Sequence, residues 1–232
     1  MKVVKYLFLV SVSLIVFLVI SIKYNLRDRH PDFSIDISLN KTGQIGQISV
    51  GFAKMPITPK ITDTWNDLNG NARYEPKKGD FYNDINDNGM FDPIWIGGFH
   101  NSRPAQGVHD DLWARVMVLD DGKTQIAIVS IDAVGLIYDD AVDIRKEVKK
   151  KIGCDYTIVS STHVHQAPDL IGIWGPSYFK SGVNKHYMQY VKKQTIAAIS
   201  TAVKNLVPAT LRIGQDLTGA IPFVVDSRDP QE

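Results

Sequence analysis

The hydrophobic pattern of the chain begins with an unbroken apolar run from Tyr6 to Ile22. Lysines flank this run on both sides, and no polar face interrupts it. Its 17 residues fit both the shortest membrane-spanning helices and the longest cores of signal peptides. We therefore interpret residues 1–23 as a signal peptide or an uncleaved signal anchor. Both interpretations predict an exported protein, either membrane-anchored or secreted (periplasmic in a bacterium).

Short apolar runs and amphipathic segments alternate over the second half of the chain. The segments that predict strands are Gln47–Ala53, Ala114–Leu119, Gln125–Ile131, 156–160 and a run from Ala209 to Gln215. The segments that predict helices run from Asp139 or Asp140, as the N-terminal cap, to Gly153, and from Asn184 to Leu206.

The order of these segments predicts the fold class. Asp121-Gly122 is a hairpin signature, and the strand Gln125–Ile131 is followed by a helix and then by the strand at 156–160. Strand, helix and strand in this order form a βαβ unit with a parallel pair. We expect an α/β domain with a mixed sheet and flanking helices, preceded by the hydrophobic N-terminal segment.

Composition removes several classes of function. The net charge is +1, so nothing favours nucleic-acid binding, and the hydrophobic content of 44% suits one sizeable domain. Cys154 is the only cysteine, which excludes an internal disulfide and a cysteine-based zinc site.

Two histidines, His163 and His165, follow directly after the strand at 156–160. Side chains alternate along an extended backbone, so both imidazoles of a His-x-His segment can face one cavity. Imidazole is also a preferred ligand of zinc, and α/β sheets place their chemistry at strand ends. The pair is equally compatible with two surface histidines.

Three further residues are candidates for the same edge of the sheet. Asp132 ends the strand next to the histidine pair, and either Asp132 or Asp169 could hold a ligand imidazole in its correct tautomer. His109 is a possible additional site residue. It is equally interpreted as a loop histidine that bonds a neighbouring carboxylate.

Residues 63–93 contain a duplicated acidic segment with an offset of 17 positions. Side-chain oxygens at alternate positions are typical of a calcium loop. Neither copy has the acidic residue that closes an EF-hand loop, because Lys78 and Trp95 stand there. The alternative is a pair of Asx-rich turns held by aromatic side chains. The candidate calcium ligands are Asp67, Asn69, Asn71 and Glu75 in the first copy and Asp84, Asn86, Asn88 and Asp92 in the second.

Four segments, in this order, resemble the neutral/alkaline non-lysosomal ceramidases and their bacterial relatives. They are Val50–Pro59 (VGFAKMPITP), Gly107–Arg115 (GVHDDLWAR), Ser130–Gly135 (SIDAVG) and Ser161–Pro168 (STHVHQAP). The last is similar to the family signature Thr-His-Thr-His-Ser-Gly/Ala-Pro.

The resemblance implies a zinc-dependent hydrolase of an N-acyl amide bond, with N-acylsphingosine or a similar sphingolipid as substrate. It implies that His163 is a zinc ligand and that His165 faces the substrate, while Asp132 is a supporting residue by position. The later histidine, glutamate and tyrosine ligands of the family would lie beyond residue 232. The resemblance therefore implies an incomplete catalytic domain.

These interpretations divide the chain into residues 1–23, a linker at 24–45 and the N-terminal part of a ceramidase-like domain at 46–232. Its partners would be a lipid amide and, through the N-terminal segment, a membrane. Two other functions stay open. One is a calcium-stabilised extracellular binding or structural module, and the other is a hydrolase of a different amide or ester.

Overall fold

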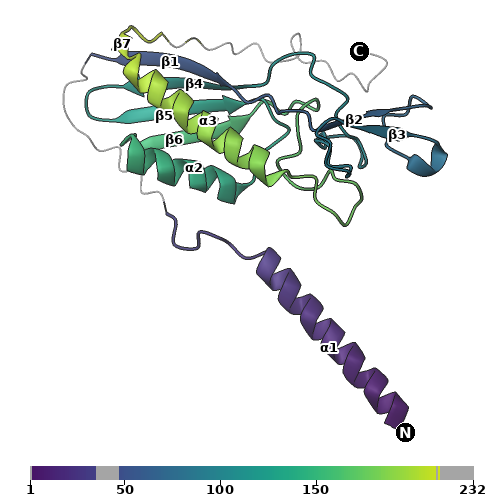
Figure 1. Cartoon of the computed structure of the whole chain (residues 1–232). Helices are drawn as coiled ribbons and strands as arrows, with labels where there is room; N and C mark the ends of the chain where they lie inside the picture. The colour runs from purple at the N-terminus through teal and green to yellow at the C-terminus, as the bar shows by residue number, and fades with distance from the viewer. Residues whose placement is uncertain (1, 35–46, 213, 215–232) are drawn as a thin grey trace, which may run out of the picture.

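The computed structural model describes residues 2–34, 47–212 and 214, and confirms the expected α/β class (Figure 1). A five-stranded mixed sheet has the order β6-β5-β4-β1-β7, and a two-stranded sheet pairs β2 with β3. The elements are α1 (Lys2–Asn25), β1 (Ser49–Pro56), β2 (Asp63–Asn66), the 3-10 turn η1 (Pro76–Lys78), β3 (Phe81–Asp84), β4 (Trp113–Asp120), β5 (Gln125–Ile131), α2 (Tyr138–Lys151), β6 (Tyr156–Ser161), α3 (Lys185–Lys204) and β7 (Val207–Pro208).

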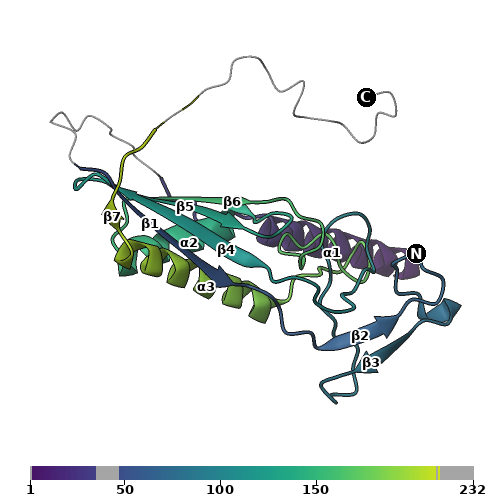
Figure 2. The same ribbon diagram turned by 90° about the horizontal axis from the view of Figure 1, so that it is seen from above.

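Helices α2 and α3 both pack on one face of the large sheet, as the two views agree (Figures 1 and 2). Small and β-branched side chains of β4 and β5 point to this face and are buried against the helices. They are Ala114, Val116, Val118, Ala127, Val129 and Ile131. Strand alternation explains why every second residue enters the core.

The opposite face of the sheet also carries apolar side chains. Phe52, Met117, Ile128 and Ile158 are aligned across β1, β4, β5 and β6 by the strand register. Among the described residues no helix covers this face, and Phe52 and Ile158 are 64% and 51% exposed.

The expected βαβ unit is present, because β5 and β6 are parallel and α2 connects them. The register pairs Ile131 with Ser161, so the segments after both strands lie at one edge of the sheet. The expected capping of α2 by Asp139 or Asp140 is wrong. Ile137 is the cap residue, and both aspartates lie inside the first turn, where they pair with Arg29.

The ends of the expected domain differ from the sequence prediction in two ways. The last strand is β7, which precedes Ala209 and pairs with β1 at the edge of the sheet, where a proline is tolerated. Residues 213 and 215, at the end of the expected strand, lie outside the described residues, as does the 35–45 part of the expected linker.

Helix α1 is exposed along its described length and extends away from the sheet (Figure 1). Its segment Val4–Asn25 has a mean hydropathy of 2.4 and is long enough to cross a membrane. Length and composition alone do not separate such a helix from a signal sequence.

Candidate functional site at the carboxyl edge of the sheet

His163 and His165 meet at the edge where β5 and β6 end. Their Nε2 atoms lie 3.4 Å apart, and their rings are 5.0 Å apart between centroids. The Nδ1 atom of His163 lies 2.7 Å from the carbonyl oxygen of Val134, in the segment after β5. His163 is exposed and His165 is half-buried, so the pair lies at the surface of the domain.

The spacing of these nitrogens fits a single tetrahedral metal ion. Two ligands of a zinc ion with bonds of about 2.0–2.1 Å lie about 3.3 Å apart. Donation of the Nδ1 proton of His163 to Val134 leaves the Nε2 lone pair free to bind a metal. In the described part of the chain no group of three or more His, Cys, Asp or Glu side chains could hold a metal.

The backbone around the pair adopts conformations that side chains rarely accept. His163 has φ +61° and Phe99 has φ +62°, and such left-handed conformations cost energy for bulky residues. The ring of Phe99 contacts His165 edge-on, at 5.0 Å between centroids. A Cβ atom on Gly98 would lie 2.6 Å from Cγ of His165, so only glycine fits beneath that ring.

Arg103 fixes the loop that carries His165. It donates to the backbone oxygen of His165 and to Oε1 of Gln166, both at 2.8 Å. Burial lowers the pKa of its guanidinium group. The sequence analysis did not identify Gly98, Phe99 or Arg103. The Gly97-Gly98 pair was the available signal, since adjacent glycines often mark a close approach of the backbone to another group.

A cavity of about 560 Å³ lies beside the histidine pair. It reaches the residues on both sides of His165, and its walls are largely apolar. Its walls include Trp65, Ile96, Arg103, His109, Val164 and Gln166. A mainly apolar cavity with a few polar groups is the usual form of a small-molecule site.

The other candidates occupy different surroundings. Both carboxylate oxygens of Asp132 lie 2.7 Å from the same guanidinium nitrogen of Arg115, and one also accepts the backbone N–H of Trp113. Asp169 is buried and accepts backbone N–H groups of its own loop. The hydrogen bond to the ring of His163 thus involves Val134 rather than either carboxylate. His109 is exposed and lies 2.8 Å from the carboxylate of Asp110.

The two acidic segments form matching loops at opposite ends of the β2–β3 ribbon. Asp67 accepts the backbone N–H groups of Gly70, Asn71 and Ala72. Asp84 does the same for Asn88 and Gly89 in the second loop. The amide nitrogens of Asn71 and Asn88 lie within hydrogen-bond distance of Glu75 and Asp92. The expected ligands of each copy are therefore gathered within their own loop.

Two buried carboxylates, one at the start of β2 and one just before β3, accept backbone N–H groups of the loops. Asp80, just before the second loop, accepts N–H groups of Leu68 and Glu75 in the first. Asp63, before the first loop, accepts those of Ile85 and Asp92 in the second. Burial, and then the neighbouring Asp92 carboxyl, raise the pKa of Asp63. Neither aspartate was predicted from the sequence, although the two obey the same offset of 17 (80 − 63).

The fold and the histidine pair define an α/β protein with a candidate functional site at the carboxyl edge of its sheet. No family model matches the chain, and no curated protein matches it. The solved structures that are similar to it include the neutral ceramidase from Pseudomonas aeruginosa and a ceramidase complexed with C2. Each match has a TM-score of 0.49 and 15% identity, over 70% of this chain. The chain spans 22% of the length of those proteins.

Proposed function

We propose that this chain contributes to a zinc-dependent hydrolase that cleaves the amide bond of an N-acyl lipid, as ceramidases do. The single observation that supports it most is the 3.4 Å separation of the His163 and His165 Nε2 atoms, with Nδ1 of His163 against a carbonyl. The ordered sequence motifs point to the same chemistry. Zinc bound here would activate an amide carbonyl and water as a Lewis acid.

The residues at the carboxyl edge of the sheet would have different roles in this reaction. His163 would hold the metal through Nε2, with its ring oriented by Val134. The separation of the imidazoles also supports His165 as a second donor to the same ion, whereas the family resemblance predicts that it faces the substrate. Arg103 would keep His165 in place, and the adjoining apolar cavity suits an acyl chain. Asp132 is a supporting residue by position only.

Metal binding to the purified chain tests this assignment directly. We expect titration with Zn²⁺, or with Co²⁺ followed by its visible absorption, to show one site that His163→Ala abolishes. Binding should be weaker than in complete catalytic sites, which use three protein ligands. His186→Ala is the matched control, because that imidazole is exposed in the first turn of α3 and does not line the cavity.

The behaviour of His165→Ala separates the two roles of that residue. Loss of Co²⁺ absorption would make it a ligand, and retained absorption with lost cleavage of a fluorescent N-acylsphingosine would place it on the substrate. Equal metal uptake by the wild type and His163→Ala would contradict the proposal. A panel of other amides and esters distinguishes a ceramidase from a hydrolase of a different substrate.

The paired acidic loops favour a second function, that of a calcium-stabilised extracellular module. Each loop gathers oxygen-bearing side chains within one turn, and oxygen ligands without histidine suit a hard cation. If each loop binds Ca²⁺, calcium at about 100 times the dissociation constant should stabilise the chain by about 2.7 kcal/mol per site. Magnesium at the same concentration is the control cation.

Thermal melts with calcium and with a chelator measure this effect. Asp67→Ala and Asp84→Ala should each remove part of the calcium-dependent increase in melting temperature, since each removes the central carboxylate of one loop. A melting temperature that is the same in calcium and in chelator would exclude the module as a calcium-dependent structure.

A further inference from the structure

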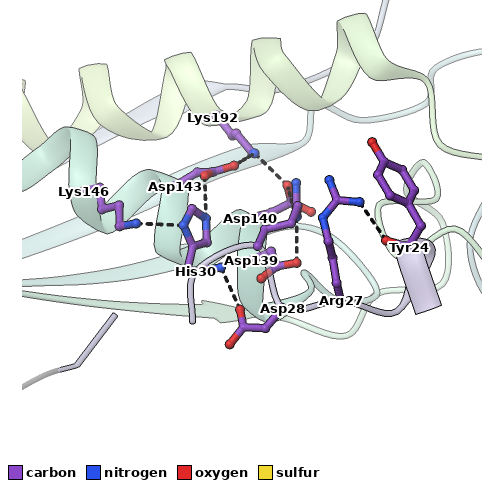
Figure 3. Close-up of polar contacts among 10 residues, drawn as sticks. Tyr24, Arg27, Asp28, His30, Asp139, Asp140, Asp143, Lys146 and Lys192 are labelled. Carbon is purple, nitrogen blue, oxygen red and sulfur yellow. Dashed lines mark hydrogen bonds and ion pairs between the residues drawn. The ribbon is translucent and has the colours of Figure 1, made fainter. Parts of the chain in front are cut away.

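The segment after α1 is bound to the start of α2 by ion pairs. Arg29 donates to Oδ2 of Asp139 at 2.7 Å and to Oδ1 of Asp140 at 3.2 Å. His30 approaches Oδ1 of Asp143 with Nε2 at 2.9 Å (Figure 3). We call Arg29, His30 and these three aspartates the α2 clamp. It joins the chain that leaves α1 to a helix of the folded domain.

The α2 clamp is not an isolated surface contact. Lys192 of α3 bonds Asp140 at 2.6 Å and also bonds Asp143, so the same carboxylates join α2 to α3 (Figure 3). Lys146 lies 2.8 Å from Nδ1 of His30 on the other side of the ring. Three acidic groups thus face two lysines, an arginine and a histidine. Networks of this kind hold a segment better than single surface pairs do.

The distance from the end of α1 to the α2 clamp is short. Arg29 is four residues past Asn25, so at most about 14 Å of extended chain separates them. Helix α2 starts at Tyr138, shortly after the carboxyl end of β5. The end of α1 is therefore tied close to the edge of the sheet that carries His163 and His165.

A rigid loop with an aromatic tip projects from this same edge. Buried Asp169 accepts three backbone N–H groups at its base, and Gly182 lies so close to Trp174 that a Cβ would come within 1.9 Å of its carbonyl oxygen. A bridge between Ser177 and Lys180 closes the far end. Tyr178 and Phe179, the aromatic tip, are 84% and 101% exposed.

Adjacent apolar side chains exposed on a fixed loop are typical of surfaces that contact proteins or membranes, and Tyr178 and Phe179 form such a pair. Aromatic side chains favour the boundary between water and lipid, and Lys180 beside the tip suits phospholipid headgroups. Helix α1 of the same chain has the length and hydropathy to cross a bilayer, which would bring a lipid surface close to the domain. In both views α1 runs towards the side of the molecule that carries the loops of the carboxyl edge (Figures 1 and 2).

We propose that α1 crosses a phospholipid bilayer and that the α2 clamp holds the carboxyl edge of the sheet against it, with Tyr178 and Phe179 inserted among the headgroups. Membrane attachment would then have two parts, a spanning helix and an interfacial contact. The domain would have one fixed orientation, with the histidine pair facing lipid rather than turning freely on its tether. This inference depends neither on zinc nor on the reaction.

Fluorescence of the full chain in phosphatidylcholine vesicles tests the contact. With buried Cys154 replaced (Cys154→Ala), an environment-sensitive label is attached at Phe179→Cys or, as the matched control, at Phe52→Cys, which is 64% exposed on the open sheet face. We expect the label at 179 to emit at shorter wavelength and to lose at least half its intensity to lipids with a nitroxide near the headgroup. The label at 52 should show neither change.

The α2 clamp is tested in the same assay. Arg29→Glu should reduce quenching at 179 to the level at 52, and the swapped pair Arg29→Glu with Asp139→Lys should restore it. Restoration excludes a simple folding defect, which circular dichroism checks independently.

Three results would overturn the proposal. The first is a label at 179 that is as exposed to water as the label at 52, and the second is quenching that survives Arg29→Glu. The third is a blue shift that depends on protein concentration and does not respond to the nitroxide lipid. That result would assign the aromatic tip to a second protein copy.

Discussion

The sheet and the polar loops of this domain are stabilised in different ways. The sheet buries many small apolar side chains against α2 and α3, so its stability is spread over a large contact surface. The loops, at about 57–112 and 162–184, depend on three buried carboxylates, Asp63, Asp80 and Asp169. Each accepts two or three backbone N–H groups. A single polar side chain can therefore hold as much structure in the loops as a large apolar residue holds in the core.

Replacement of Asp169 should give the largest loss in the free energy of unfolding. Asp169→Ala would leave the N–H groups of Ile171, Gly172 and Trp174 without their acceptor. Because bonds to charged groups and unsatisfied buried donors each cost about 1–3 kcal/mol, we expect a loss of about 4 kcal/mol in the free energy of unfolding. Urea unfolding in detergent micelles measures it.

Asp169→Asn is the matched variant, since it keeps one oxygen acceptor, and its loss should be about half as large by the same values. A loss below about 1 kcal/mol for Asp169→Ala would show that the loop does not depend on this carboxylate.

An apolar truncation in the core should rank second. Ile144 of α2 is fully buried, so Ile144→Ala should cost about 3 kcal/mol through lost burial and the remaining cavity. Ile158→Ala removes the same atoms from the open face of the sheet, where the side chain is 51% exposed. It should cost well below half as much. Equal losses in urea unfolding would mean that both faces are covered in solution.

The close packing of the loop that carries the aromatic tip provides a third test. Gly182→Ala would place a Cβ 1.9 Å from the carbonyl oxygen of Trp174. We expect a loss of about 2 kcal/mol, typical of overpacking, and faster proteolysis near residue 178. Gly107→Ala is the control, because no atom lies within 4 Å of its added Cβ. Similar stability of the two variants would show that the loop adapts without cost.

The α2 clamp should show the smallest effect, and a dependence on pH. Burial raises the pKa of Asp143, but hydrogen bonds from Lys192 and then His30 outweigh it and lower the pKa overall. A lowered carboxyl pKa stabilises the fold above its unfolded value of about 3.9, and the contribution disappears as the pH falls through the lower folded value.

Asp143→Asn should therefore lower the melting temperature at neutral pH, and the difference from wild type should vanish as the pH falls through the lowered folded pKa of Asp143. Asp87→Asn makes the same substitution at an exposed loop position and is the control. A difference that stays constant with pH would assign the effect to packing rather than charge.

The sequence predicted most of the sheet because its signals are local. The continuous apolar run Gln125–Ile131 and the Asp-Gly turn before it need no distant partner. The N-terminal cap of α2 was misassigned because Asp139 and Asp140 pair with Arg29, which lies 110 positions away from Asp139. No local pattern reports such a contact.

The same reason explains which residues of the candidate site could be predicted from the sequence. His163 and His165 were identified by their position after a strand, and the structure brings their Nε2 atoms together. Gly98, Phe99 and Arg103 were missed because they reach the pair through the fold rather than through the sequence. Asp132 ends β5 as expected, but its bonds go to Arg115.

Asp63 and Asp80 place the closure of both acidic loops on the β2–β3 ribbon. Asp63 is the first residue of β2 and Asp80 directly precedes β3, so each loop closes where the two strands meet. The pair should therefore open and close as one unit, with the amide hydrogens of Glu75 and Asp92 exchanging at a common rate. A duplication of this kind yields a single cooperative element rather than two independent ones.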